Sequence, residues 1–220
     1  MVKRLIILGA PGVGKGTQAI RLQKDFGWVH ISTGDMLRDA VQVGTLLGRR
    51  AQKYMEKGEL VPDDLMIELV ANRLDQDDCR EGFILDGFPR TVHQAERLDG
   101  LLLKLDLVID CVVSIDVSKE EINRRLTQRL VCEMCGYVVT IMDEVKEGDR
   151  CPSCRGRLQR RKDDRSETVH RRLEVYEKQT RSLIRYYERR KLLKVVDGFG
   201  SMDEVYAKIL YSLGFTSGLA

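Results

Sequence analysis

The sequence predicts an α/β fold of three layers, in which helices cover both faces of a central parallel sheet of five strands. Three observations predict it. Five short apolar runs are spaced along the chain, at residues 5–8, 28–31, 83–85, 107–115 and 192–196. Segments with helical periodicity separate these runs, which is the alternation expected of a parallel sheet. A glycine-rich turn follows the first run, and two Cys-x2-Cys pairs mark a small unit of their own.

The glycine-rich turn, Gly9 to Thr17, leads into a helix expected from Thr17 to about Phe26. A strand, a glycine-rich turn and a helix in this order form the context of a phosphate loop. The glycines permit positive φ, so that backbone N–H groups can converge on an anion, and the helix start adds free N–H donors. Lys15 can then reach the β- and γ-phosphates as a compact point charge.

A glycine-rich turn with an incidental lysine is the alternative interpretation of this stretch. The strand before it and the density of glycines make it the weaker one. The motif also departs from the usual Gly-Lys-Ser/Thr ending, because Gly16 separates Lys15 from the hydroxyl of Thr17. We expect this loop to bind a nucleoside triphosphate or a molecule very similar to one.

The composition limits the class of protein. The chain has 220 residues, of which 43% are hydrophobic and 32% charged, and this fits a globular protein with a substantial core. The formal net charge of +3 is too small to demand a nucleic-acid partner. No apolar run approaches membrane-spanning length, and the apolar run at residues 5–8 is too short for a signal peptide. We expect a cytoplasmic protein with neither nucleic acid nor membrane as a partner.

Four of the six cysteines have the spacing of zinc ligands, with fifteen residues between two Cys-x2-Cys pairs: Cys132, Cys135, Cys151 and Cys154. Four thiolates leave a tetrahedral ion no open position, so the zinc we expect here is structural. A small segment with few large apolar residues needs such a staple. Two disulfides are the poorer explanation in a cytosolic protein. Cys79, in a polar turn, and Cys111, in an apolar run, receive no role.

Residues 32–61 form a helical insertion between two strands. A capped turn at 32–35 starts one helix, residues 46–56 form a second, and another helix is expected from Asp63 to about Leu74. Insertions at the carboxyl ends of parallel strands are where such folds bind ligands. We interpret His30 as a strand residue with satisfied hydrogen bonds rather than a ligand. Asp35 could be catalytic, but helix capping is the favoured role.

The third apolar run ends in Asp86 and continues into the turn Gly87-Phe88-Pro89-Arg90. Phosphate-loop enzymes use a carboxylate at such a strand end to hold Mg²⁺, usually through water. Gly87 and Pro89 turn the chain sharply and project Arg90, whose planar guanidinium suits bidentate phosphate binding. Such a turn is weak evidence by itself, but together with the upstream phosphate loop it becomes strong.

The rest of the chain continues the alternation of helices and strands. A helix is expected at residues 118–128 and a strand at 192–196, followed by a closing helix at 201–213. Between them lies a long helix with a buried stripe at three- and four-residue spacing. The stripe consists of Val169, Leu173, Tyr176, Thr180, Leu183 and Tyr187.

Four motifs together resemble the adenylate kinase family: Gly9 to Thr17, Ile31 to Arg38, Leu60 to Asp63, and Asp86 to Thr91. The cysteine pairs are similar to the zinc-bearing lid of many bacterial members. The resemblance covers the chain from about residue 4 to about residue 200, and several of its motifs are specific to the family. It implies a P-loop core at 1–31, 62–128 and 165–220, a monophosphate-binding insertion at 32–61 and a zinc lid at 129–164.

The resemblance implies reversible transfer of the γ-phosphoryl group of Mg·ATP to AMP, which gives ADP, and it implies a monomer. The implied AMP-binding residues are Thr33, Arg38, Glu59, Leu60, Val61, Gly87, Phe88, Pro89, Arg90, Gln94, Arg161 and Arg172. The implied ATP-binding residues are Gly12, Val13, Gly14, Lys15, Gly16, Thr17, Arg125, Arg129, Val138, Val139 and Gly200.

Catalysis in this family would rest on positioning and on electrostatic stabilisation of the transferring group. The side chains implied to surround that group are Lys15, Arg90, Arg129, Arg161 and Arg172, with Mg²⁺ organised by Asp86 through water. Asp163 and Asp164 match the acidic pair that closes the lid.

The chain departs from the family pattern in and beside its lid. Gln128 and Leu130 replace a glycine and an arginine, and the Tyr-His and Pro-Pro pairs usual between the cysteines are missing. Val138 and Val139 therefore stand where nucleotide contacts are expected. We expect a stiffer hinge and the loss of one cationic contact.

Three other functions compete with this one. A kinase for another nucleoside monophosphate is closest in class, although Thr33 and Gln94 favour AMP. A nucleic-acid binder with a basic zinc ribbon explains neither the turn at 86–90 nor the insertion, and its ribbon lacks aromatic residues for stacking on single strands. A regulatory triphosphatase would not need a second set of phosphate-binding arginines.

Overall fold

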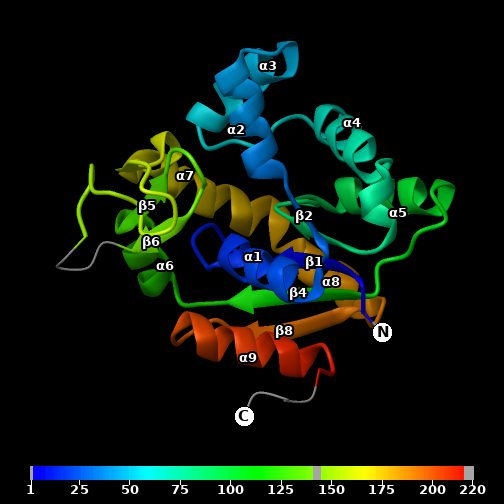
Figure 1. Ribbon diagram of the computed structural model, residues 1–220. Helices are drawn as coiled ribbons and strands as arrows, with labels where there is room; N and C mark the ends of the chain where they lie inside the picture. Colours follow the sequence, from blue (N-terminus) through cyan, green and yellow to red (C-terminus); the bar gives the residue numbers. More distant parts are fainter. Residues whose placement is uncertain (1, 141–144, 216–220) are drawn as a thin grey trace.

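Five parallel strands form the central sheet, in the order β2-β3-β1-β4-β8 (Figure 1). Their bounds are β1 Arg4–Leu8, β2 Val29–Ser32, β3 Phe83–Asp86, β4 Cys111–Asp116 and β8 Leu193–Asp197. The predicted α/β fold with a five-stranded parallel sheet is confirmed. The computed structural model describes residues 2–140 and 145–215, without the side chain of Lys162. Residues 1, 141–144 and 216–220 of the expected core and lid lie outside the described residues.

Helices cover both faces of the sheet because successive residues of a strand point to opposite sides. Leu5 and Ile7 of β1 pack in one apolar cluster with α1 (Lys15–Phe26), α6 (Lys119–Thr127), α7 (Ser166–Val175) and α9 (Met202–Ser212). Ile6 and Leu8 pack in the other, with α4 (Asp63–Leu74), α5 (Val92–Lys104) and α8 (Ser182–Arg189). None of these four side chains is more than 5% exposed. The burial of each contributes about 1.5–3 kcal/mol to stability.

The insertion consists of α2 (Thr33–Val43) and α3 (Leu46–Glu56), which project beyond the carboxyl ends of the strands (Figure 1). Ser32 and Thr45 cap the two helices by accepting the backbone N–H of the third residue that follows each. The two helices come very close at Gly48, where an added Cβ would lie 2.0 Å from the carbonyl oxygen of Ala40. A glycine is therefore required for this pairing.

The cysteine-bearing segment forms a small antiparallel sheet in the order β6-β5-β7. Its strands are β5 Arg129–Cys132, β6 Val138–Thr140 and β7 Leu158–Gln159, and a 3₁₀ turn at Lys162–Asp164 connects it to α7. Its interior contains only Leu130, Leu158 and two cysteines as buried apolar residues of the described part. An apolar core of this size cannot hold a fold by itself.

Two local expectations, on the fourth strand and on the long helix, need correction. The fourth strand begins at Cys111 rather than Leu107, because Asp110 accepts the backbone N–H groups of Lys3 and Arg4 at 2.8 Å and ends the connection there. Cys79 lies in the expected polar turn, the 3₁₀ turn Asp77–Arg80, although its own side chain is fully buried. The long helix is divided into α7 and α8 by a π-helical turn, Tyr176–Thr180, in which the Arg181 N–H reaches the carbonyl oxygen of Tyr176 at 2.9 Å.

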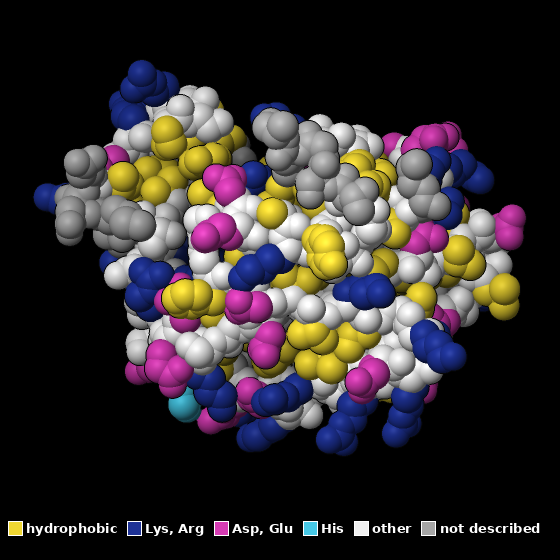
Figure 2. Space-filling view, turned by 90° about the horizontal axis from the view of Figure 1, so that it is seen from below, with side chains coloured by type: hydrophobic (Ala, Val, Ile, Leu, Met, Phe, Trp, Pro, Cys, Tyr) yellow, Lys and Arg dark blue, Asp and Glu magenta, His cyan; other side chains and the backbone are white. Residues whose placement is uncertain are grey.

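The surface below the sheet mixes charges of both signs. Figure 2 shows this face, on which α9 lies, with lysine and arginine side chains interspersed among acidic and apolar ones. Such a pattern agrees with the small net charge of the chain. Within residues 2–140 and 145–215, no helix combines the length and the apolar character needed to cross a membrane.

The contact at Gly48 generates a stability prediction. Gly48→Ala places a methyl group against the backbone of α2, and we expect it to lower the free energy of unfolding by about 1–3 kcal/mol. Gly100→Ala is the matched control, because Gly100 lies in α5, is exposed and has no atom within 4 Å of its added Cβ. There the same change should raise stability by about 0.5–1 kcal/mol. Urea unfolding of both variants measures the difference, and equal effects would contradict the close approach of α2 and α3.

Candidate active site

The glycine-rich loop curls around the side chain of Lys15. The Lys15 ammonium donates to the carbonyl oxygens of Gly9 and Ala10, both at 2.9 Å. Gly14 has φ of 103° as the N-cap of α1 and offers no side-chain cap, so the first N–H groups of the helix stay available to an anion. Gly12 has φ of 86°, and a Cβ there would lie 2.6 Å from the Leu126 side chain. The loop therefore has the backbone geometry of a phosphate cradle.

Burial, together with the neighbouring charges of Arg90 and Arg172, lowers the pKa of Lys15 to about 8. The negative charge of Asp86 raises the pKa of Lys15, but by less than burial and the arginines lower it. The ammonium is therefore only moderately stable in the absence of an anion, and a bound phosphate would stabilise it.

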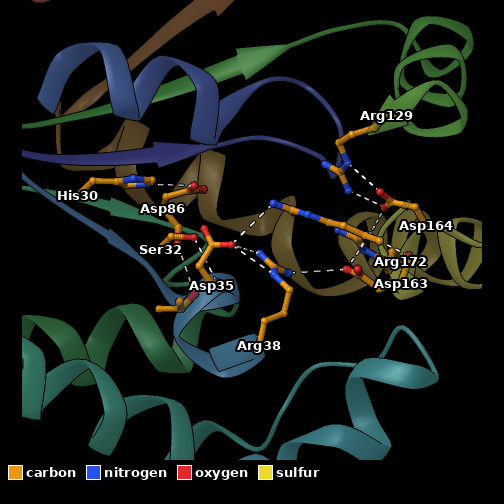
Figure 3. A network of polar contacts seen from close by, with 11 residues as sticks. His30, Ser32, Asp35, Arg38, Asp86, Arg129, Asp163, Asp164 and Arg172 are labelled. Carbon is orange, nitrogen blue, oxygen red and sulfur yellow. Dashed lines mark hydrogen bonds and ion pairs between the residues drawn. The ribbon is translucent and has the colours of Figure 1, made fainter. Parts of the chain in front are cut away.

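Asp86 ends β3 between β1 and β2, where its register partners are Ile7 and Ser32. Burial opposes its ionisation, but the hydrogen bond from His30 and the charge of Lys15 prevail, so that the pKa of Asp86 lies below its ordinary value. The His30 Nε2 atom lies 3.3 Å from the Asp86 carboxylate, and both side chains are largely buried (Figure 3). The Nε2 atom of His30 thus has a partner within the sheet, as expected of a strand residue, but that partner is a candidate site residue. The sequence signal for this contact was a polar side chain, His30, inside an otherwise apolar run.

Five arginines approach the same region from different parts of the chain: Arg38 on α2, Arg90 after β3, Arg129 on β5, Arg161 before the 3₁₀ turn and Arg172 on α7. Figure 3 shows Arg38, Arg129 and Arg172 pointing toward one another across this region. No two of the five lie closer than eleven residues apart in sequence. Only the fold brings them together.

Carboxylates hold these guanidinium groups in place. Arg129 forms a bidentate pair with Asp164, with its Nε at 2.8 Å, and Arg172 reaches the same carboxylate at 3.1 Å. Asp163 lies 3.1 Å from Arg172 and 3.8 Å from Arg38. The acidic pair therefore connects the lid segment both to α7 and to the insertion.

Asp35 requires a correction. Helix capping was the favoured role, but Ser32 is the cap, and its hydroxyl accepts the Asp35 N–H at 3.3 Å. The Asp35 carboxylate instead pairs with Arg38 at 2.6 Å and lies 3.7 Å from Arg161. Burial raises the pKa of Asp35, but Arg38 and the other partners outweigh it and lower the value to about 2. An acidic residue at the start of a helix can either cap the helix or pair with a nearby arginine, and its spacing in the sequence does not distinguish the two roles.

Positive charge exceeds negative charge in this cluster. Six cationic side chains face four carboxylates: Lys15 and the five arginines against Asp35, Asp86, Asp163 and Asp164. Burial first, and then the charge of Arg172, lowers the pKa of Arg90 to about 10. Burial and the charge of Arg38 lower that of Arg161 to about 10 as well. An arrangement of this kind is suited to a ligand with several negative charges.

Two cavities meet at this cluster. The first, with about 540 Å³ of empty space, is lined by the phosphate loop, Lys15, Arg90 and Arg172. The second, with about 600 Å³, is lined by Arg38, the segment 58–61 of the insertion, Gln94 and Asp163. Arg90, Arg172 and Leu60 line both. The two spaces therefore share the guanidinium groups of Arg90 and Arg172.

The remaining site residues lie around these cavities. Thr33 is fully buried and donates to the Gly87 carbonyl at 3.0 Å, and Phe88 and Pro89 follow in the same turn. Arg125 donates to the carbonyl oxygens of Val13, in the phosphate loop, and Gly198, two residues before Gly200. Gln128 ends α6.

Two valines and a leucine of the lid are part of its small sheet. Val138 and Val139 pair with β5, and Val139 packs against the lid interior. Leu130, which replaces the family's arginine, is fully buried there. The departure at 130 thus supplies apolar core to the lid.

The four cysteines of the lid come together. Their Sγ atoms all lie within 4.8 Å of one another, with Cys132 to Cys154 at 3.4 Å and Cys135 to Cys151 at 3.7 Å. Ligands about 2.3 Å from a tetrahedral zinc would be about 3.8 Å apart. Backbone N–H groups of Met134, Ser153 and Gly156 point at three of the sulfurs at 3.4 Å, as they do around thiolates. The donor set fits a closed four-sulfur site.

The fold and the cluster define a phosphate-loop α/β protein with a second cavity that is lined by arginines. Residues 7–192 match the family model described as "Adenylate kinase". The chain is 50% identical to the adenylate kinase of Carboxydothermus hydrogenoformans, with 96% of this chain and 99% of that protein covered. It is 48% identical to the adenylate kinase of Thermodesulfovibrio yellowstonii, with coverage of 94% and 96%, and 50% identical to that of Archaeoglobus fulgidus, with 93% and 95%. The chain belongs to the adenylate kinase family of nucleoside monophosphate kinases.

The lowered pKa of Lys15 generates a prediction about anion binding. Sulfate, which stays a dianion throughout, should bind most tightly below pH 8, where Lys15 is protonated in the free protein. Above pH 8 binding must also take up a proton, so the Kd should rise by up to about tenfold per pH unit. Calorimetric titration between about pH 7 and 9.5, at ionic strength matched with chloride, measures this dependence.

Lys15→Gln is the control for this titration, because its side chain carries no ionisable proton. It should bind sulfate weakly, with no inflection near pH 8. A Kd for the unchanged protein that stays constant across the range would contradict the lowered pKa.

Proposed function

We propose that this protein transfers the γ-phosphoryl group of ATP reversibly to AMP, which gives ADP. One observation carries the proposal: a row of desolvated cationic side chains lies between a phosphate loop and a second cavity that contains its own arginines and a glutamine. A transferring phosphoryl group would lie at that boundary. Membership of the adenylate kinase family supports the same reaction.

The ATP phosphates would occupy the loop Gly12-Val13-Gly14-Lys15-Gly16-Thr17, where N–H groups and Lys15 converge. Arg129 would contact the terminal phosphate, and Arg125 supports the loop through its bond to Val13. Backbone groups near Val138, Val139 and Gly200 are proposed to contact the rest of the nucleotide.

The AMP phosphate would lie between Arg38 and Arg90 in the second cavity, with Arg161 and Arg172 beside it. Thr33, Glu59, Leu60, Val61 and the turn Gly87-Phe88-Pro89 would surround the nucleoside. The Gln94 amide, 1% exposed, would contact the adenine edge.

The chemistry requires no nucleophile from the protein, because an AMP phosphate oxygen attacks the γ-phosphorus and ADP leaves. The protein holds donor and acceptor in line and stabilises the charge that spreads over the transferring oxygens. Lys15, Arg90, Arg129, Arg161 and Arg172 would do this. Asp86 would hold Mg²⁺ through water; when bound with ATP, that ion neutralises charge on the donor phosphates.

Water must be kept from the transferring group, since it would otherwise accept the phosphoryl in place of AMP. We propose that residues 32–61 and 129–164 move as closing units against the core at 1–31, 62–128 and 165–220. Asp163 and Asp164 would stabilise the closed form, because they link lid arginines to α7 and the insertion.

We further propose a cytoplasmic monomer without nucleic-acid partners. The mixed surface charge in Figure 2 supports the absence of a nucleic-acid surface on that face. A kinase for another monophosphate is the competing function, and it differs in the acceptor base.

A coupled assay of ADP formed from ATP and AMP tests the function. We expect ADP production that depends on AMP and on Mg²⁺, and ATP alone should give almost no ADP.

Arg90→Ala should lower turnover by roughly two or more orders of magnitude, because it removes a charge next to the transferring group. Arg97→Ala, on the exposed side of α5, should remain near the unchanged rate. Full activity in Arg90→Ala would refute the site, and equal rates with CMP, GMP or UMP would favour the competing function.

The lid is proposed to contain one structural zinc held by Cys132, Cys135, Cys151 and Cys154. Metal analysis after gel filtration should find about one zinc per chain. Cys135→Ser should lose the metal and lower the melting temperature, whereas Cys111→Ala, outside the lid, should keep it. Stoichiometry well below one in the unchanged protein would rule out a structural zinc.

A further inference from the structure

Asp63 joins the first turn of α4 to the first turn of α5. Its carboxylate accepts hydrogen bonds from Gln94 Nε2 at 2.6 Å, from His93 Nδ1 at 2.8 Å and from the Thr91 hydroxyl at 3.2 Å. Three bonds from one helix start to one carboxylate exceed what helix capping needs, because Thr91 already caps α5 by accepting the Gln94 N–H. The arrangement holds the Gln94 side chain in particular.

The Gln94 amide is fixed at both of its ends. Its Oε1 accepts the backbone N–H of Arg90 at 2.7 Å, while its Nε2 donates to Asp63. A backbone N–H can only donate and a carboxylate can only accept, so these partners allow the amide one orientation. Rotation of the amide by half a turn would set N–H against N–H and oxygen against oxygen in a buried place, and both hydrogen bonds would be lost.

The fixed amide keeps one N–H and one oxygen lone pair for a ligand, and it lines the second cavity. The edge of adenine offers an N6–H donor beside the N1 acceptor. A 6-oxopurine offers the reverse order, an O6 acceptor beside an N1–H donor. An amide that could rotate would match either edge, whereas a fixed amide matches only one.

We propose that Asp63 is a specificity-determining positioning residue, which fixes the Gln94 amide so that a 6-aminopurine monophosphate is accepted and a 6-oxopurine monophosphate is rejected. This inference rests on the proposed function, in which Gln94 contacts the acceptor base. Discrimination of this kind can be large, because the wrong base leaves buried polar groups unpaired.

Asp63→Asn tests the proposal. The new side chain has the same shape but can donate or accept, so only the Arg90 N–H still opposes rotation of the Gln94 amide, and the rotated form becomes easier to reach. Asp64→Asn is the matched control, because it removes the same charge from the same turn of α4. Asp64 is 90% exposed, and its one ion pair, with Arg97, is long at 4.0 Å. Both variants are assayed with ATP and either AMP or IMP as the acceptor.

We expect the ratio of kcat/KM for AMP to that for IMP to fall by about tenfold or more in Asp63→Asn, chiefly through the KM of the acceptors. In Asp64→Asn the ratio should stay within about twofold of the unchanged protein. A folded Asp63→Asn protein with an unchanged ratio would overturn the proposal, even if its activity with both acceptors fell equally. If the unchanged protein does not use AMP at all, the proposed function fails instead.

A measurement without substrate guards against a variant that does not fold. In the unchanged protein, NMR should show the Gln94 side-chain NH₂ protons exchanging slowly with water, because one is donated to Asp63 in a buried place. Fast exchange of these protons in the unchanged protein would overturn the fixed orientation. In Asp64→Asn they should exchange slowly as well.

Discussion

The accumulation of positive charge at the carboxyl edge of the sheet is the constraint on which the rest of the structure depends. Lys15 and five arginines are brought out of water beside one another, and the pKa values of Lys15, Arg90 and Arg161 fall because burial and like charges oppose protonation. Four carboxylates offset only part of this charge. A protein organised in this way is less stable than it could be without a ligand, and a polyanion relieves the repulsion. The same charges, already oriented, can then stabilise a transferring phosphoryl group without reorganisation.

The carboxylates around the cluster also decide which parts of the chain meet. Asp164 joins β5 to α7 through Arg129 and Arg172, and Asp163 and Asp35 bring the lid segment against the insertion. These contacts orient the guanidinium groups, which is the arrangement that bidentate phosphate binding needs.

Behind the groups that would touch nucleotides stands a set of residues that orient them. His30 contacts the Asp86 carboxylate, and Asp63 holds the Gln94 amide. Both lie on elements anchored in the apolar core, β2 and α4, rather than on loops. In the lid, Leu130 and the clustered cysteines form the interior of a segment that is too small to be held by apolar packing alone.

The sequence by itself determined the order of the elements, the phosphate loop, the helical insertion and the cysteine unit. These depend on local patterns: glycines at a turn, apolar periodicity, and ligand spacing. It indicated Arg90 from the turn that precedes it, and the other arginines only through resemblance to a family, because residues as far apart as Arg38 and Arg172 carry no local sign of being neighbours. The tertiary structure alone decided that Asp35 pairs with arginines instead of capping α2, that His30 contacts Asp86, and that the long helix breaks at Tyr176. The contacts of Asp35 with Arg161 and of His30 with Asp86 join segments that are far apart in the sequence, and local periodicity does not indicate such contacts.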